Sequence, residues 1–191
     1  TEGVLTQALR SSTADPDARA QVALGLGAIV TPNALRALQD ALADLNLTVA
    51  DAAALGLQRA GARAIPYLAS AARSENPAVR RRAATALGGI QEAQAVQWLG
   101  ALLNDTEPTV RRAAADALGK VGRPEAVPLL IRALRHSDGG VAQNAARSLA
   151  RIGDPAVNAL VQALSEEQSV AYLAAHALAQ IPSAEPALLR A

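Results

Sequence analysis

The sequence contains no cysteine, no methionine and no phenylalanine among its 191 residues. Without cysteine the chain can form no disulfide and no thiolate, which excludes disulfide-stabilised folds and thiol catalysis. Its only aromatic residues are Tyr67, Trp98 and Tyr172. The core must therefore consist of alanine, leucine, valine and isoleucine. Alanine, the strongest helix former, is the most frequent residue, so the composition predicts an all-α protein.

Excess charge and long hydrophobic runs are also missing. The chain has 18 basic and 17 acidic residues and a net charge of +1, so nothing in its charge calls for a nucleic-acid partner. No apolar run approaches the roughly 18 residues of a membrane span, and the N-terminal residues lack the pattern of a signal peptide. We therefore expect a cytoplasmic protein without membrane contacts, and leave open that a signal has been removed.

One stretch of sequence recurs along the chain. PAVRRRAATALGGI at 77–90 returns as PTVRRAAADALGKV at 108–121. A column of leucines extends the pattern at nearly even intervals: Leu26, Leu57, Leu87, Leu118, Leu149 and Leu178. A period of about 31 residues is typical of stacked structural repeats.

A second helical pattern lies between these stretches. Its apolar residues recur at i, i+3 and i+7, as in Val96, Leu99 and Leu103, and form one stripe on a helix. Three acid–proline or amide–proline pairs predict helix starts, with the polar residue as N-cap: Asp15-Pro16, Asn76-Pro77 and Asp154-Pro155. Each unit is thus predicted to consist of helix A, a turn and helix B.

The repeats extend over the whole sequence. Residues 4–11 match the end of a helix B, and the last residues fall inside another unit. No linker or shift in composition divides the chain. We predict one domain, 1–191, of about six units with partial units at both ends. Uncapped ends would expose apolar surface and could pair with a second copy.

The recurring pattern P-x-V-R-x-x-A-x-x-A-L-G-x-I, carried by 77–90 and 108–121, resembles the HEAT-like repeat of the phycobilisome-lyase type. The resemblance implies a right-handed α-solenoid of stacked two-helix units. Members of that family include protein-binding scaffolds, bilin lyases and lyase-like chaperones, an iron hydroxylase and nucleic-acid-binding proteins. The His-Glu motifs of the hydroxylase are absent here, so that activity is not expected.

The resemblance also suggests a role for Arg80 and Arg111, which flank the core side of helix A. In HEAT-like repeats this arginine bonds acidic or carbonyl groups of a neighbouring repeat, and its five donors suit that task. The candidate partners are Asp15, Glu75, Asp105 and Glu107. The same position, also occupied by Arg19, holds alanine at 50, 142 and 171, where we expect packing alone. Arg81 and Arg112 are predicted to face solvent.

No catalytic, cofactor-binding or metal-binding constellation is present. His136 and His176 have no metal-ligand neighbour at i+3 or i+4. The sequence shows no phosphate-binding loop, nucleophile elbow or paired carboxylates. We predict no catalytic residue, no cofactor and no metal, and expect His136 at a helix end.

One column of helix B stands out, because Tyr67, Trp98 and Leu129 occupy the same place in three successive repeats. The resemblance implies that helix B lines a concave face, and aromatic residues are enriched at binding hot spots. We predict a partner-binding site whose residues are Tyr67, Trp98, Leu129, Gln97, Arg132 and Gln162. The alternative is that the aromatic rings fill space between neighbouring B helices.

These observations favour a non-enzymatic scaffold that binds another protein or peptide, since stacked repeats offer a long surface and no deep cleft. Two alternatives stay open. One is a bilin lyase or lyase-like subunit. The other is a nucleic-acid binder, which requires one shared face for five arginines: Arg81, Arg82, Arg112, Arg123 and Arg147.

Overall fold

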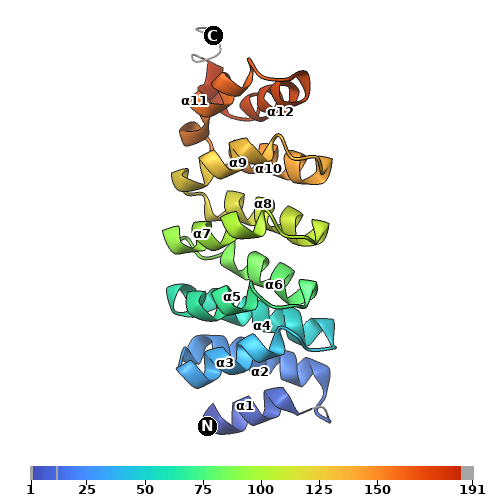
Figure 1. The fold of residues 1–191 in the computed structure, drawn as a ribbon. Coiled ribbons are helices and arrows are strands. Elements are labelled where there is room, and N and C mark those ends of the chain that lie inside the picture. The colour runs from blue at the N-terminus through green and yellow to red at the C-terminus, as the bar shows by residue number, and fades with distance from the viewer. Residues whose placement is uncertain (1, 12, 186–191) are drawn as a thin grey trace. The chain divides into compact units, whose positions relative to one another are not determined.

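The structure, a computed structural model, describes residues 2–11 and 13–185 (Figure 1). Within these ranges every regular element is a helix, which confirms the all-α prediction. The chain divides into two compact units between Ile90 and Gln91, and each is described on its own. That all residues form one domain stays a prediction.

The N-terminal unit contains six α-helices and one short 3₁₀ helix among its described residues. Helices at the predicted position of helix B (B-type) alternate along the chain with helices at the position of helix A (A-type). The A-type helices α2, α4 and α6 pack in sequence against one another, and the B-type helices α1, α3 and α5 do the same. The elements are α1 (Glu2–Arg10), α2 (Pro16–Ile29), α3 (Pro32–Ala41), α4 (Leu47–Arg59), η1 (Gly61–Ala64), α5 (Ile65–Ala71) and α6 (Pro77–Leu87).

The C-terminal unit repeats this arrangement. Its A-type helices α8, α10 and α12 pack in sequence, and so do the B-type helices α9 and α11. The elements are α7 (Ala93–Leu102), α8 (Pro108–Val121), η2 (Pro124–Ala126), α9 (Val127–Ala133), α10 (Gly139–Ile152), α11 (Asp154–Ala163), α12 (Gln168–Leu178) and η3 (Pro182–Ala184).

The predicted leucine column forms the centre of both cores. All six leucines are at most 1 % exposed: Leu26, Leu57, Leu87, Leu118, Leu149 and Leu178. Alanines on the same helix faces are also buried, which lets the A-type helices approach closely. For example, a Cβ on Gly27 of α2 would lie 2.6 Å from the Cα of Gly56 in α4.

The predicted caps are confirmed at two of three helix starts. The Asp15 carboxylate accepts the N–H of Ala18 at 3.0 Å, and the Asn76 side chain accepts the N–H of Ala78 at 2.9 Å. The prediction for Asp154 is wrong, because the helix begins one residue earlier and Gly153 is its N-cap. The Asp154 carboxylate instead accepts a hydrogen bond from the Ser183 hydroxyl.

Four turns from an A-type to a B-type helix use a left-handed residue at the same place in the repeat. Gly61, Gly122 and Gly153 occupy this place, with φ values of 63°, 69° and 78°. Val30 occupies the equivalent position one repeat before Gly61, with φ of 56°. A β-branched residue is strained in this region, whereas glycine is not.

Candidate partner-binding site

The predicted arginine contacts are present in each unit. Arg80 Nη1 donates to the carbonyls of Ser74 and Glu75, at 2.8 and 3.0 Å. Arg111 Nη1 donates to the carbonyls of Asp105 and Thr106, at 2.8 and 2.9 Å. These carbonyls lie in the loop before the arginine's own helix. The prediction of carbonyl partners in the preceding repeat is therefore confirmed.

Arg19 and Arg111 also reach the acid that precedes the next A-type helix. Arg19 donates to the Leu9 carbonyl and pairs with Asp44. Arg111 Nη2 lies 3.5 Å from Asp138 Oδ2, and the two side chains are only 16 % and 11 % exposed. Neither acid was among the predicted partners. We call this arrangement the arginine socket. In it an arginine of an A-type helix donates to one or two carbonyls near the end of the preceding B-type helix. The same arginine pairs with an acid that lies just before the next A-type helix.

The prediction that the junction at Ala50 relies on packing alone is wrong. Arg82, whose side chain is 6 % exposed, projects from α6 and donates from Nε to Asp51 at 2.9 Å. Its Nη1 donates to the Leu42 carbonyl at 3.1 Å. A guanidinium from the following repeat thus supplies the polar contacts that position 50 lacks.

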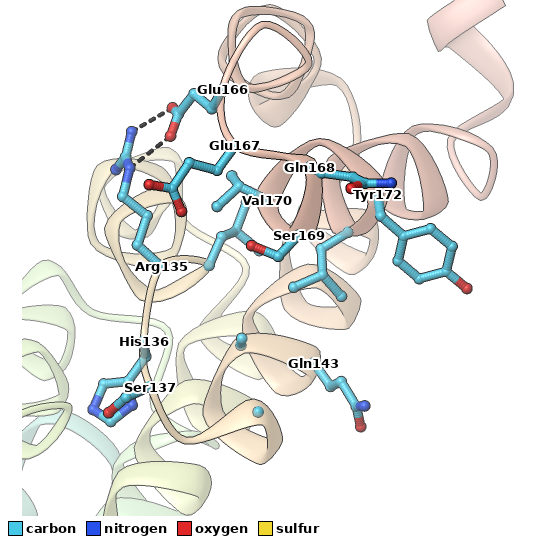
Figure 2. A pocket seen from close by; sticks show the side chains of 14 residues that line it. Arg135, His136, Ser137, Gln143, Glu166, Glu167, Gln168, Ser169, Val170 and Tyr172 are labelled. Carbon is cyan, nitrogen blue, oxygen red and sulfur yellow. Dashed lines mark hydrogen bonds and ion pairs between the residues drawn. The ribbon is translucent and has the colours of Figure 1, made fainter.

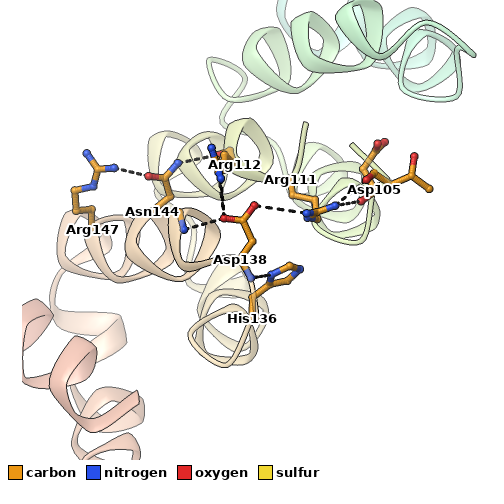
Figure 3. A network of polar contacts seen from close by, with 9 residues as sticks. Asp105, Arg111, Arg112, His136, Asp138, Asn144 and Arg147 are labelled. Carbon is orange, nitrogen blue, oxygen red and sulfur yellow. Dashed lines mark hydrogen bonds and ion pairs between the residues drawn. The ribbon is translucent and has the colours of Figure 1, made fainter. Parts of the chain in front are cut away.

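Arg112 does not simply face solvent as predicted. Its Nη2 lies 3.0 Å from Asp138 Oδ1, so Asp138 joins both arginines of α8 (Figure 3). The hydrogen bond from Arg112 lowers the pKa of Asp138, and the N–H of Gly140 contributes to the same shift. Asp138 is also the N-cap of α10. One carboxylate thereby joins α8 to the start of α10.

Three of the remaining arginines proposed for a nucleic-acid surface also have protein partners, whereas Arg81 is exposed as predicted. Arg123 pairs with Glu125 at 2.9 Å, and Arg147 donates to the Asn144 side chain. Arg82 is buried in the N-terminal unit. These contacts leave fewer cations available to phosphates than the sequence suggests.

The predicted binding residues of the C-terminal unit lie on its B-type helices. Trp98 on α7 and Leu129 on α9 are half-buried, whereas Gln97, Arg132 and Gln162 are exposed. Tyr67 lies on α5 of the N-terminal unit and is also half-buried. A continuous stripe of Tyr67, Trp98 and Leu129 stays a prediction.

Leu129 packs at a defined position on the neighbouring helix α7. A Cβ on Gly100 would lie 2.9 Å from Leu129 Cδ1, so the absence of a side chain at position 100 lets Leu129 lie over α7. Beside it is a hollow of about 280 Å³. Leu129 and Arg132 line it together with Asn104 and His136.

Sequence reasoning missed Asn104 and did not connect His136 with this surface. His136 lies just beyond α9, as expected of a helix-end residue, and its Nδ1 accepts the N–H of Asp138 at 2.9 Å. A signal was available, because both residues lie within three positions of the end of a B-type helix, at nearly the same place in successive repeats.

A larger groove, also missed, lies beside the N-terminal ends of α10 and α12 (Figure 2). Its volume is about 1130 Å³. Leu134, Val170 and Leu173 supply apolar walls, and Arg135 at the edge pairs with Glu166 through two hydrogen bonds. The Glu167 carboxylate also lines the groove.

His176 stacks on Tyr172, with ring centroids 6.5 Å apart. Over residues 2–11 and 13–185, no group of three or more histidine and acidic side chains is arranged to hold a metal. In the same ranges no helix has the length and apolar character that crossing a bilayer demands.

Comparison with known proteins identifies the repeat. Residues 65–141 and 127–191 match the family model of HEAT repeats. An engineered protein of known structure is 24 % identical, with a TM-score of 0.53 over 96 % of this chain and 97 % of that one. The complex of CpcE and CpcF of phycocyanin lyase from Nostoc sp. PCC7120 gives 25 % identity and a TM-score of 0.55, over 93 % of this chain and 76 % of that one.

A third likeness concerns the fold alone. Kap95p, in a complex with RanGDP, is 18 % identical, with a TM-score of 0.66 over 99 % of this chain and 29 % of that one. No curated protein shows significant similarity in sequence.

Proposed function

The chain belongs to the HEAT-repeat family, and we propose that it is a non-enzymatic scaffold that binds a partner protein through its B-type helices. We call the proposed surface the B-face; in the C-terminal unit it consists of Trp98, Leu129, Gln97, Arg132 and Gln162. Tyr67 extends it into the N-terminal unit if the predicted stripe is continuous.

One observation carries this proposal. On α7, α9 and α11 the same helix face presents a half-buried residue, at 98, 129 and 159, beside an exposed one, at 101, 132 and 162. At 100° per residue the two columns lie about 60° apart on each helix. The first column holds Trp98, Leu129 and Ala159, and the second holds Ala101, Arg132 and Gln162. An apolar strip thus lies beside a margin that is polar at two of three positions, and protein-binding surfaces commonly combine an apolar centre with a polar rim.

The structural relatives are consistent with such a role. The titles of two of them describe a complex of CpcE with CpcF and the binding of RanGDP by Kap95p. Those partners belong to those proteins. For this chain they support only the general proposal that a stacked helical surface engages another protein.

Affinity capture from the source organism tests the proposal. The full chain is compared with the Trp98→Ala, Leu129→Ala double variant, and Gln21→Ala, at an exposed position on α2, serves as the matched control. We expect a protein that the full chain and the control retain and the double variant loses. Equal retention by all three would exclude the B-face as the binding surface.

A lyase-like subunit is the second candidate, because the chain is 25 % identical to the phycocyanin lyase complex. Mixing the chain with phycocyanobilin and an apo-phycobiliprotein tests this directly. A shift of the bilin absorption band that depends on the chain would favour the lyase, and an unchanged spectrum would favour the scaffold.

The cytoplasmic location expected from the sequence stays a prediction, which fractionation of the source cells can check.

A further inference from the structure

We propose that the groove beside α10 and α12 is an arginine socket without an arginine of its own, and that it receives an arginine side chain from a partner protein. The inference rests on the proposed scaffold function, because it presumes such a partner. It concerns a different surface from the B-face, so the two can be tested separately.

The complete socket one repeat earlier shows what the site holds. Arg111 donates to the carbonyls of Asp105 and Thr106, at 2.8 and 2.9 Å. Its other terminal nitrogen lies 3.5 Å from Asp138, the N-cap residue of α10 (Figure 3). Arg19 makes the equivalent contacts with Leu9 and Asp44, so the arrangement is a property of the repeat.

The acceptors of this socket recur around the groove, but the arginine does not. Ala142 stands one repeat after Arg111, and His136 and Ser137 stand one repeat after Asp105 and Thr106. Glu167 is the N-cap residue of α12, as Asp138 is of α10. Ala142, His136, Ser137 and Glu167 all line the groove (Figure 2).

These acceptors have no donor among the residues that the structure describes. Over residues 2–11 and 13–185, no group donates a hydrogen bond to the carbonyls of His136 or Ser137, and none pairs with the Glu167 carboxylate. Arg135, which lines the groove, is paired with Glu166. Among the described residues, the groove is therefore lined by one carboxylate residue without an ion-pair partner and by two residues whose backbone carbonyls have no donor.

Ala50, another position of the column that lacks the arginine, shows that the chain can fill such a gap itself. At Ala50, Arg82 of the next A-type helix supplies the guanidinium, as described above. The position that corresponds to Arg82 in α12 is Leu173, which lines the groove. Here the next helix contributes apolar surface instead of a donor.

The chemistry of the groove selects arginine. Leu134, Val170 and Leu173 can receive the three methylenes of its stem. A planar guanidinium has five donors and can reach the two carbonyls and the carboxylate together, whereas a lysine ammonium acts as a single point of charge. The expected occupant is an arginine flanked by neutral or apolar residues in an extended segment of the partner.

A peptide titration of the full chain tests this proposal. The probe is acetyl-Ser-Leu-Arg-Leu-Ser-amide, and its control is the same peptide with citrulline, which has the shape of arginine but no charge. Backbone amide NMR should show saturable shifts confined to 134–143 and 166–173. Because hydrogen bonds to charged groups are worth about 1.5–3 kcal/mol, the citrulline peptide should bind at least about tenfold more weakly.

Two test variants and one control variant make the test specific. Ala142→Arg should place a guanidinium in the socket, abolish binding of the arginine peptide and raise the unfolding temperature. Gln21→Arg adds the same charge at an exposed position on α2 and should change neither. Ala142 is buried, so Glu167→Gln provides an independent test at an exposed site, and should weaken the arginine peptide about tenfold.

Equal binding of the citrulline peptide, shifts outside the groove, or unchanged binding by Glu167→Gln would overturn the proposal. So would a dimer of the unliganded chain that Ala142→Arg converts to monomer, because the occupant would then be a second copy. The two proposals can fail separately. Peptide binding that fails while the B-face variant loses capture would overturn the groove proposal alone, and normal peptide binding with unchanged capture by the B-face variant would overturn the B-face proposal alone.

Discussion

At the scale of single residues, Val30 has a backbone conformation that is unfavourable for valine. It occupies the left-handed position that Gly61, Gly122 and Gly153 hold elsewhere, with φ of 56°. For residues other than glycine that conformation costs roughly 1–2 kcal/mol. We expect Val30→Gly to stabilise the chain by about 0.5–1 kcal/mol, because glycine also loses more entropy on folding.

Chemical denaturation of Val30→Gly checks this expectation, and Gly122→Val is the reciprocal control. The control should be destabilised, since it introduces the same strain where the chain now has none. A Val30→Gly variant less stable than the parent would show that the half-buried valine side chain contributes more by packing than the backbone loses.

Two glycines of one helix should respond in opposite ways to the same change. Gly27 approaches α4 so closely that an added Cβ would lie 2.5 Å from the carbonyl oxygen of Gly56, whereas Gly25 has nothing within 4 Å. Gly27→Ala should destabilise by about 1–3 kcal/mol through overpacking. Gly25→Ala should stabilise by up to about 1 kcal/mol through helix propensity. Equal free energies of unfolding in the two variants would contradict the close approach of α2 and α4.

Asp138 makes stability depend on pH in a defined direction. Its pKa is lowered in the folded chain by the hydrogen bond from Arg112. A lowered pKa means that its stabilisation is fully present above the pKa of the unfolded chain, about 3.9, and is lost as pH falls through the folded value. Asp138→Asn keeps an N-cap side chain but removes the charge.

Unfolding by urea at a series of pH values from 7 downward checks this prediction. The Asp138→Asn variant should be the less stable at pH 7, and the difference should shrink below a pH of about 4. Because other carboxylates such as Asp116 also have lowered pKa values, only the difference between parent and variant isolates Asp138. A difference that does not change with pH would contradict the ion pairs drawn in Figure 3.

At the scale of elements, the sequence was sufficient to predict the alternating helices. The leucine column lies in the core at the same place of every A-type helix. Its period therefore shows which residues of successive repeats are equivalent. Asp15 and Asn76 act as caps because their roles are local. Asp154 fails as a cap because Gly153, with φ of 78°, takes the N-cap position and the acid becomes the first helical residue.

The contacts between repeats were harder to predict, since several loop acids compete for each arginine. Arg111 donates to the backbone carbonyls of the loop before its helix and pairs with the carboxylate of Asp138, just before the next A-type helix. The prediction named acidic residues but did not say whether their carboxylates or their backbone carbonyls accept the hydrogen bonds. One rule would have helped. Arg82 with Asp51, and Arg135 with Glu166, are each one period apart in the sequence. An acid and an arginine with this separation lie at equivalent places on adjacent repeats.

The groove could not be inferred from any single column. It depends on Ala142, on the loop of His136 and Ser137, and on Leu173 from the next A-type helix. The sequence shows only that an arginine is missing at position 142. Whether the following helix replaces it, as Arg82 does for Ala50, becomes clear only when the neighbouring helices are in place.

At the scale of the whole molecule, two separate surfaces are proposed for recognition: the B-face and the groove. A HEAT-repeat chain offers such surfaces because each repeat contacts only its neighbours and leaves its outer helix faces free. Binding to a partner should therefore be distributed over several repeats, with a few side chains carrying most of its free energy.

The most direct test of the scaffold proposal is the Kd of the captured partner, measured by calorimetry for the full chain and for the Trp98→Ala, Leu129→Ala variant. A hot spot is worth about 2 kcal/mol or more, so the variant should bind at least about 30-fold more weakly, with Gln21→Ala unchanged. An unchanged Kd in a folded double variant would contradict the central claim that the B-face is the partner-binding surface.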